Sequence, residues 1–335
     1  MRTIPHVQTL ESPCSPSPRY KQLQWFVRTN LNVLGLLGTL ILMLMLFSVL
    51  SPYFLSFDNF MNIARAVAVR GIVAIGLTMV MISGGLDLSI ASVMAAAGML
   101  TATLLQAGLS EWSASLVAIA SGALMGAING VFVTKVRINP IIATLGSMSI
   151  MRGAGYLYSG GIALSIGADQ FKYLGRGHML GIPVPVVIWA LIGALAFLAL
   201  RYTRLGQYAF AIGGNPIACR VTGINVDLWR MVLYITCGTL SGLAGVVLTS
   251  LSGTATPTAA LGAELDIVAA VVLGGISLSG GKGSILGTVL GMLVLGTMAN
   301  GMTLTNVSPY WQVLLRGVVL MAAVSLDSLR TNPTR

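Results

Sequence analysis

The chain has few charged residues for its length of 335. Lys, Arg, Asp and Glu make up 8% of it, whereas a soluble domain carries roughly a quarter. Acids are the scarcest, with 9 Asp and Glu against 19 Lys and Arg. The three cysteines, Cys14, Cys219 and Cys237, have neither metal-site nor disulfide spacing. These shortages exclude a soluble globular domain and a disulfide scaffold, and the mean hydropathy of +0.88 indicates a protein built for a bilayer.

Sequence motifs for catalysis are also missing. The chain has no His-Glu-x-x-His zinc motif and no Gly-x-Ser-x-Gly elbow, and its two histidines, His6 and His178, fall in a predicted tail and loop. Gly275–Gly283 resembles a phosphate-binding loop, but Ile276 stands where glycine is required and Gly283 where Ser or Thr would bind magnesium. We therefore expect no enzyme activity, cofactor or metal, and any ATP hydrolysis must belong to another chain.

Apolar runs predict the fold class. An all-α polytopic membrane protein with about ten transmembrane helices, some of them short or broken, is expected over residues 31–330. Residues 1–30 are predicted to form a flexible cytoplasmic tail. The 40 glycines fit helices that pack closely. The runs are Val33–Leu50, Gly71–Ser83, Ser89–Ala107, Ser113–Val133, Ile141–Leu157, Ile182–Leu200, Met231–Ser250, Leu265–Gly275, Ile285–Ala299 and Tyr310–Leu326.

The net charge of +10 follows the same topology. With ten spans and a cytoplasmic N-terminus, most cations fall inside, among them Lys135, Arg201 and Arg220, while Arg65, Arg70, Lys172 and Arg176 fall outside. This is the positive-inside pattern, so the charge indicates orientation and requires no nucleic-acid partner.

A polar, basic interval from Arg201 to Arg230 separates two long apolar runs and carries helix boundary signals. Asn215 can cap a helix, Pro216 suits the first helical position, and Gly223 can adopt the left-handed conformation that ends it. The interval predicts a short docking helix outside the bilayer. Its candidate residues are Asn215, Pro216, Ile217, Ala218, Cys219, Arg220, Val221, Thr222 and Gly223.

Two glycine-containing segments, Gly84–Ser89 and Gly274–Ser279, resemble each other. Each follows an apolar run too short to span comfortably, which favours helices broken inside the membrane along a substrate path. A chance match between two ordinary turns is the alternative. A carboxylate at the depth predicted for Asp87 is costly, so Asp87 should pair with a cation, meet water or, most simply, cap the following helix, a role that Ser89 can also fill. The path candidates from these segments are Gly84, Gly85, Asp87, Ser89, Gly274 and Gly275.

Further polar residues lie in the predicted spans. They can form a polar lining that hydrogen-bonds a hydroxylated solute, or they can act as interhelical glue and snorkelling groups. All acids other than Asp87 are placed at loops or span ends, which counts against a proton relay. The residues are Asn129, Asn139, Asn300, Gln312, Arg152 and Arg316, of which Asn129 and Asn300 join the path candidates.

Three segments, Ile82–Ser89, Ala211–Asn225 and Leu265–Gly283, closely resemble the ribose-type permeases of bacterial ABC sugar importers. That group includes membrane subunits for ribose, xylose, arabinose, galactosides and the autoinducer-2 furanose. The similarity runs in order from about Phe57 to Asp327. One departure is Ala218-Cys219, where the family usually has two alanines.

The resemblance implies a permease subunit of the inner membrane with both termini in the cytoplasm. It implies a second permease copy or paralogue and cytoplasmic ATPase subunits that bind residues 201–230 as a coupling loop. It also implies a periplasmic binding protein that selects a pentose or hexose. That protein is expected to dock on Gly160–Gly181, with Asp169, or on Ser252–Glu264, although both segments can instead be plain solvated connections. Arg65 and Arg70 can meet its acidic residues or neutralise lipid phosphates.

Other functions stay open at this point. A permease for branched-chain amino acids shares the general layout, and an ion-coupled secondary carrier would need no ATPase. A membrane-embedded enzyme would need a reactive constellation of side chains, and none is visible in the sequence.

Overall fold

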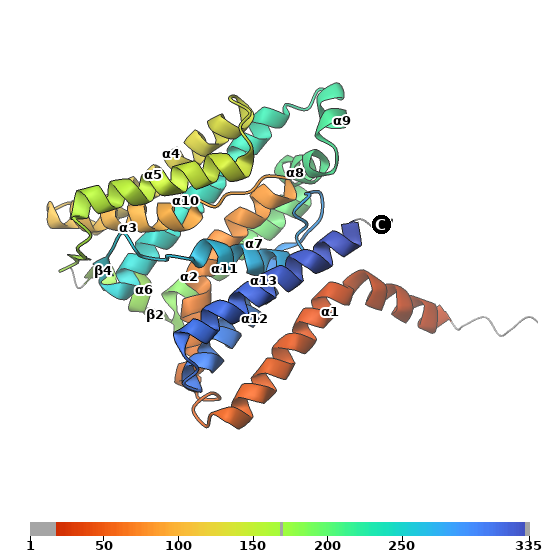
Figure 1. Ribbon diagram of the computed structural model, residues 1–335, viewed down its shortest axis with the longest axis horizontal. Helices are drawn as coiled ribbons and strands as arrows, with labels where there is room; N and C mark the ends of the chain where they lie inside the picture. The colour runs from red at the N-terminus through yellow and green to blue at the C-terminus, as the bar shows by residue number, and fades with distance from the viewer. Residues whose placement is uncertain (1–17, 168–169, 332–335) are drawn as a thin grey trace, which may run out of the picture.

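The computed structural model describes residues 18–167 and 170–331, and these are mostly helical (Figure 1). Four short elements join the long helices: η1 (Gln170–Lys172), α6 (Tyr173–Arg176), α8 (Arg204–Gly214) and α9 (Pro216–Val221). The long helices are α1 (Pro18–Leu50), α2 (Phe57–Ile82), α3 (Ile90–Gln106), α4 (Glu111–Thr134), α5 (Pro140–Ser159), α7 (Val184–Tyr202), α10 (Val226–Ser252), α11 (Ala263–Leu273), α12 (Ile285–Leu304) and α13 (Pro309–Thr331).

Six helical segments in the described part of the chain are long and apolar enough to cross a membrane. They are Val33–Leu50, Phe57–Ile82, Glu111–Thr134, Val184–Tyr202, Val226–Ser252 and Ile285–Leu304. Each predicted apolar run falls on a helix, but α3 has 17 residues and α11 has 11. The sequences of α5 and α13 are interrupted by polar residues. The expected ten spans are therefore not confirmed by length and composition.

Two predicted boundaries differ from the structure. Helix α1 begins at Pro18, so it extends into the segment expected to be a tail, and residues 1–17 lie outside the described part of the chain. Helix α2 begins at Phe57 rather than near Gly71, so the run before Gly84 is not too short to span. The length of α2 was not evident from the sequence, because Asp58, Arg65 and Arg70 interrupt the apolar pattern in its first half, whereas its second half is buried.

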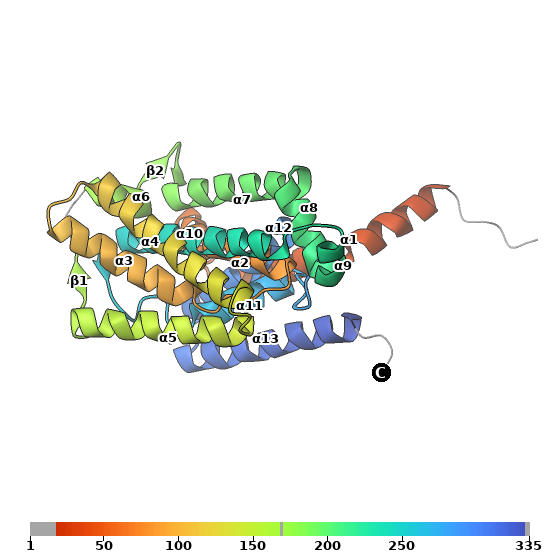
Figure 2. The ribbon, with the colours of Figure 1, turned by 90° about the horizontal axis from the view of Figure 1, so that it is seen from above.

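The core is built around α2 and α10, which run through the middle of the molecule between α7 and the α5–α13 side (Figure 2). Close backbone approach supports this packing. A Cβ atom on Gly122 or Gly126 of α4 would collide with the backbone of α10, and one on Gly238 would collide with α4. Small residues thus let these helices pack tightly, as the glycine content predicts.

The two ends of the molecule differ in structure. One end carries α8, α9 and the C-terminal end of α13, and the other carries α6 and two small strand pairs (Figure 1). Strand β1 (Leu164–Ser165) pairs antiparallel with β4 (Thr254–Ala255), and β2 (His178–Met179) pairs with β3 (Ile182–Pro183). The β1–β4 pair joins the two loops predicted at the outer surface. Asp169, named as part of the first loop, lies outside the described residues.

The loop before α7 is fixed to the end of α10 rather than freely solvated. Arg176 donates from Nε to the Leu251 carbonyl at 2.7 Å and from Nη2 to the Ser252 carbonyl at 3.1 Å. Arg65, predicted on the same side, lies 3.2 Å from Nε2 of His178. These contacts make the strand-bearing end a connected surface.

Candidate functional site

Helix α9 forms with the boundaries that its sequence predicts. The Asn215 side-chain oxygen accepts hydrogen bonds from the amides of Ile217 at 3.1 Å and Ala218 at 3.0 Å, and Pro216 is the first helical residue. At the other end Gly223 has φ +83° and donates to the Arg220 carbonyl, while Ile224 donates to the Cys219 carbonyl. This pair of bonds is a Schellman motif, and it satisfies the last helical carbonyls.

The two faces of α9 differ in exposure. Cys219 is buried with Ile212 of α8 and Val226 of α10, which fixes one face to the body of the molecule. Ile217 and Val221 are 72% and 84% exposed, and their spacing of four residues places them on one face. A rigid helix thus presents two large apolar side chains at the end of the molecule.

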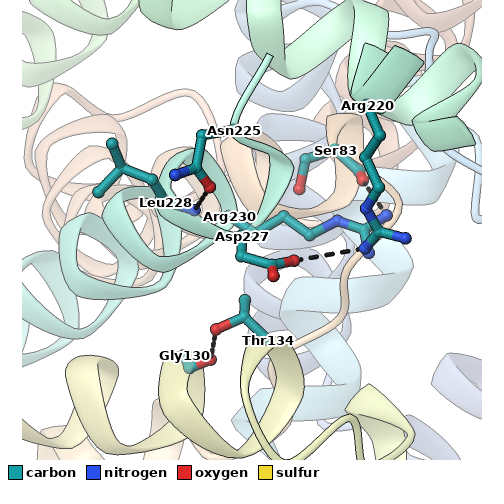
Figure 3. A network of polar contacts seen from close by, with 8 residues as sticks. All are labelled: Ser83, Gly130, Thr134, Arg220, Asn225, Asp227, Leu228 and Arg230. Carbon is teal, nitrogen blue, oxygen red and sulfur yellow. Dashed lines mark hydrogen bonds and ion pairs between the residues drawn. The ribbon is translucent and has the colours of Figure 1, made fainter. Parts of the chain in front are cut away.

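Ionic and polar contacts tie α9 to the transmembrane core (Figure 3). Arg220 Nη2 lies 3.3 Å from Oδ1 of Asp227 at the start of α10. One turn further along α10, Arg230 donates from Nη2 to the Ser83 carbonyl at 3.1 Å, directly after α2. Asn225 caps α10 by accepting from the Leu228 amide at 3.0 Å. Helix α9 is thus bonded to the start of α10, and α10 is bonded to the residue that follows α2.

The two similar glycine segments meet in space, next to α8. The amide of Gly281 donates to the Ile82 carbonyl at 2.8 Å, and a Cβ on Gly280 would lie 2.8 Å from the Cα of Gly84. A Cβ on Gly213 would collide with both the Ile82 carbonyl and the Gly281 amide. The three motifs that carry the family resemblance thus converge at one place, which their spacing in the sequence does not reveal.

Asp87, Ser89 and Asn129 form a buried polar cluster. Oδ1 of Asp87 accepts from the Ser89 amide at 2.9 Å and the Ser89 hydroxyl at 2.6 Å, and Asn129 Nδ2 donates to the Ser89 hydroxyl at 2.8 Å. All three residues are at most 1% exposed. The cluster ties the start of α3 to α4.

The predicted capping of α3 is wrong in detail. Ser89 is the cap residue, but its side chain makes no bond to the helix, and its φ and ψ of −77° and −10° are already helical. Asp87 accepts from the amide of Ser89 itself rather than from the first turn of α3. The hydroxyl of Ser89 donates to this carboxylate instead of accepting from the helix.

A cavity of about 470 Å³ opens between α2, α3, α10, α11, α12 and α13. Its charged centre is Asp266, whose Oδ2 lies 3.0 Å from Nη1 of Arg316 and 3.6 Å from Nη1 of Arg70. The side chain of Asp266 is 14% exposed. The polar side chains that line the cavity are Asn62, Arg70, Asp266, Asn300, Thr303, Gln312 and Arg316.

Some of the predicted polar lining reaches this cavity and some does not. Asn300, Gln312 and Arg316 line it. Asn300 also exchanges two hydrogen bonds with Asn59, at 2.9 and 3.1 Å, so it fastens α12 to α2 as well. Asn139 instead caps α5, and Arg152 contacts the Pro257 carbonyl at 3.4 Å. The remaining path candidates do not line the cavity: Gly84, Gly85, Asp87, Ser89, Asn129, Gly274 and Gly275.

Sequence reasoning missed Asp266, because it placed every acid other than Asp87 at a loop or span end. Asp266 is in the first turn of α11 and faces a cavity between helices. The available signal was Arg316, an unpaired cation in a predicted span that needed an acidic partner. Arg70, expected to face outward partners, pairs with the same carboxylate.

Comparison with known proteins matches residues 59–324 to a family described as the permease component of the branched-chain amino acid transport system. The ribose import permease protein RbsC of Escherichia coli K12 is 40% identical over 309 residues, covering 91% of this chain and 96% of that protein. RbsC of Bacillus subtilis is 40% identical over 293 residues, covering 87% and 91%. The L-arabinose permease AraH of Escherichia coli K12 is 37% identical over 303 residues, covering 89% and 92%.

The chain belongs to this permease family. The resemblance inferred from the three motifs is therefore confirmed, and the relatives are transport subunits rather than enzymes. The matched range of this permease includes α9, the converging glycine segments and every residue that lines the cavity. Family membership and six apolar helices together identify a multi-pass membrane protein.

Proposed function

We propose that the chain is the membrane subunit of a bacterial ABC importer and forms the pathway for a monosaccharide across the inner membrane. The observation that carries this proposal is the similarity, over 91% of the chain, to a ribose import permease. The similarity to an L-arabinose permease extends it to a second pentose. Sugar of pentose or hexose size is the substrate class.

In this proposal the helices α3, α5, α11 and α13 join the six longer spans, which gives about ten segments in the membrane. The end that carries α9 lies in the cytoplasm together with both termini. The distribution of cations supports this orientation. Lys135 follows α4, Arg201 is in the last turn of α7, Arg204 begins α8, and Arg220 is in α9 itself, so these cations gather toward the end that carries α9.

The cytoplasmic ATPase docks on α9, and residues 201–230 act as the coupling loop. A groove on the ATPase covers Ile217 and Val221, which are otherwise exposed apolar side chains on a well-capped helix. ATP-driven movement of the ATPase pulls on α9, and the Arg220–Asp227 and Arg230–Ser83 contacts carry the movement to α10 and α2. The glycine segments after α2 and α11 meet at that point and move with it.

At the opposite end, a periplasmic sugar-binding protein docks on the surface joined by the β1–β4 pair. Arg176 fixes that surface to α10, so docking there acts on the same helix that is bonded to α9 at its other end. A second copy of the chain, or a paralogue, completes the pathway. The surrounding lipid contacts the exposed apolar faces of the outer helices.

The first test is reconstitution with the ATPase, a sugar-binding protein and ATP. We expect ATP-dependent uptake of D-ribose or L-arabinose into proteoliposomes. Val221→Asp should lose both uptake and co-purification of the ATPase, because it places a charge on the docking face. Leu180→Asp is the matched control for co-purification of the ATPase alone, since Leu180 is 98% exposed at the other end, where the binding protein docks. ATPase retention by Val221→Asp would refute docking through α9.

A second candidate substrate is a branched-chain amino acid, because the description of the matched family names one. The same vesicles with leucine and a matching binding protein separate the two substrates. Uptake by this chain alone, driven by an ion gradient without ATP, would refute the importer and establish a secondary carrier.

A further inference from the structure

The cavity between α2, α11, α12 and α13 has the chemistry of a solute site. We propose that it is a transient binding station for a neutral monosaccharide, with Asp266 and Arg316 as the recognising pair and Thr303 and Gln312 as further polar groups of the lining. This inference rests on the proposed function and adds to it where the sugar is held during transfer.

The carboxylate and the guanidinium retain bonding capacity. Both arginines contact Oδ2 of Asp266, and within the described part of the chain Oδ1 has no hydrogen bond or ion pair. The side chain of Arg316 is 31% exposed and uses Nη1 for Asp266, so it keeps donors of its fork for another partner. A sugar diol offers a donor to Oδ1 and an acceptor to the guanidinium side by side.

Helices α12 and α13 add further oriented polar groups to the lining. Gln312 Nε2 donates to the Val307 carbonyl at 3.2 Å and lies 3.4 Å from the Thr303 hydroxyl, which fixes the amide against α12. Val67, Met292 and Leu295 also line the cavity and offer apolar contact to the C–H face of a sugar ring. The volume of about 470 Å³ lies within the roughly 300–1,000 Å³ of small-molecule sites.

The charges of the lining favour neutral solutes over cations. Among the described residues that line the cavity, two arginines face one carboxylate, which leaves one net positive charge. An amino sugar of the same size would add a second positive charge to a partly buried site. Because Arg70 and Arg316 already satisfy part of the carboxylate, binding should be weak, as a transfer station requires.

The first test compares uptake by the reconstituted transporter, with ATPase and binding protein, for wild type, Asp266→Asn and Thr303→Val. We expect Asp266→Asn to lower ribose uptake about tenfold, the effect of losing one hydrogen bond to a charged group. Thr239→Val is the matched control. Like Thr303, Thr239 donates its hydroxyl to the carbonyl four residues earlier, but it does not line the cavity.

If wild type imports sugar and both cavity variants import it equally well, the cavity is not a binding station, while the proposed importer function is still supported. No ATP-dependent sugar uptake by wild type would overturn the proposed function itself. Faster uptake of an amino sugar than of the neutral sugar would also contradict the predicted charge preference.

A second measurement does not depend on altering the ion pair. Thr303→Cys in the assembled complex is labelled with a small maleimide, and D-ribose should slow the labelling. Thr239→Cys should show no slowing. The wild-type chain gives the background labelling of Cys14, Cys219 and Cys237, of which Cys219 and Cys237 are buried. Labelling at Thr303→Cys that ribose does not change, or that added phospholipid slows instead, would overturn the proposal and assign the cavity to lipid.

Discussion

Two carboxylates among the helices, Asp87 and Asp266, lie in contrasting surroundings. Asp87 is 1% exposed and bonds to Ser89 and Asn129, in a closed cluster. Asp266 faces a cavity and shares one oxygen between Arg70 and Arg316. The first fastens helices and is shut off from solvent, and the second borders a space that can admit a solute. A carboxylate between helices is therefore a candidate for solute binding only when it borders such a space.

Removing the carboxylate of the closed cluster should have the largest effect on stability. In Asp87→Ala the Ser89 amide, Ser89 hydroxyl and Asn129 amide lose an acceptor, at about 1–3 kcal/mol for each donor left unsatisfied. We expect a large fall in the thermal midpoint in detergent, and a smaller one for Asp87→Asn, which keeps an oxygen. Wild-type stability of Asp87→Ala with loss of uptake would instead place Asp87 on the substrate path.

The contact between the glycine segments and α8 provides a matched pair of variants. Gly213→Ala should destabilise by about 1–3 kcal/mol, because its Cβ collides with the Ile82 carbonyl and the Gly281 amide. Gly214→Ala should be close to neutral, since no heavy atom lies within 4 Å of its Cβ. Thermal melting of the two variants checks this, and equal melting would contradict the convergence of the segments.

Asp266→Asn should affect uptake more than stability, the opposite of what we expect for Asp87→Ala. Its arginine partners are 44% and 31% exposed and can be hydrated, so we expect a stability loss of less than about 1 kcal/mol. Uptake should fall far more than stability. If Asp266→Asn lowers the melting point as much as Asp87→Ala does, Asp266 has a structural role like that of Asp87, and the proposed difference between the two carboxylates is wrong.

The Arg220–Asp227 pair should show the smallest stability effect. Its side chains are 53% and 28% exposed, so its loss should cost about 0–1 kcal/mol. Arg220→Asp should nevertheless reduce coupling of ATP hydrolysis to uptake, and Arg220→Asp with Asp227→Arg should restore part of it. The ratio of ATP hydrolysed to sugar imported measures this, and no recovery in the double variant would show that the pair does not transmit movement.

Local features were predictable where one short segment determines them. Asn215, Pro216 and Gly223 specify both ends of α9, because caps and left-handed turns depend on neighbouring residues. The family followed from three motifs in order, and the comparisons confirm it. The start of α2 was missed although Ser56 caps it locally, because charged residues interrupt the apolar run of its first half and find their partners far away in the chain.

The sequence alone determined that the chain is an apolar, helical membrane protein of the permease family with a capped helix outside the core. Composition, the length of apolar runs and helix capping depend on residues close together in the chain, so they can be read from the sequence. Only the tertiary structure decided that the glycine segments meet, that Asp87 is enclosed, and that Asp266 shares a cavity with Arg70 and Arg316. These depend on contacts between residues up to about 200 positions apart, such as Ile82 with Gly281 and Arg70 with Asp266. The packing of whole helices decides such contacts, and no local sequence pattern indicates them.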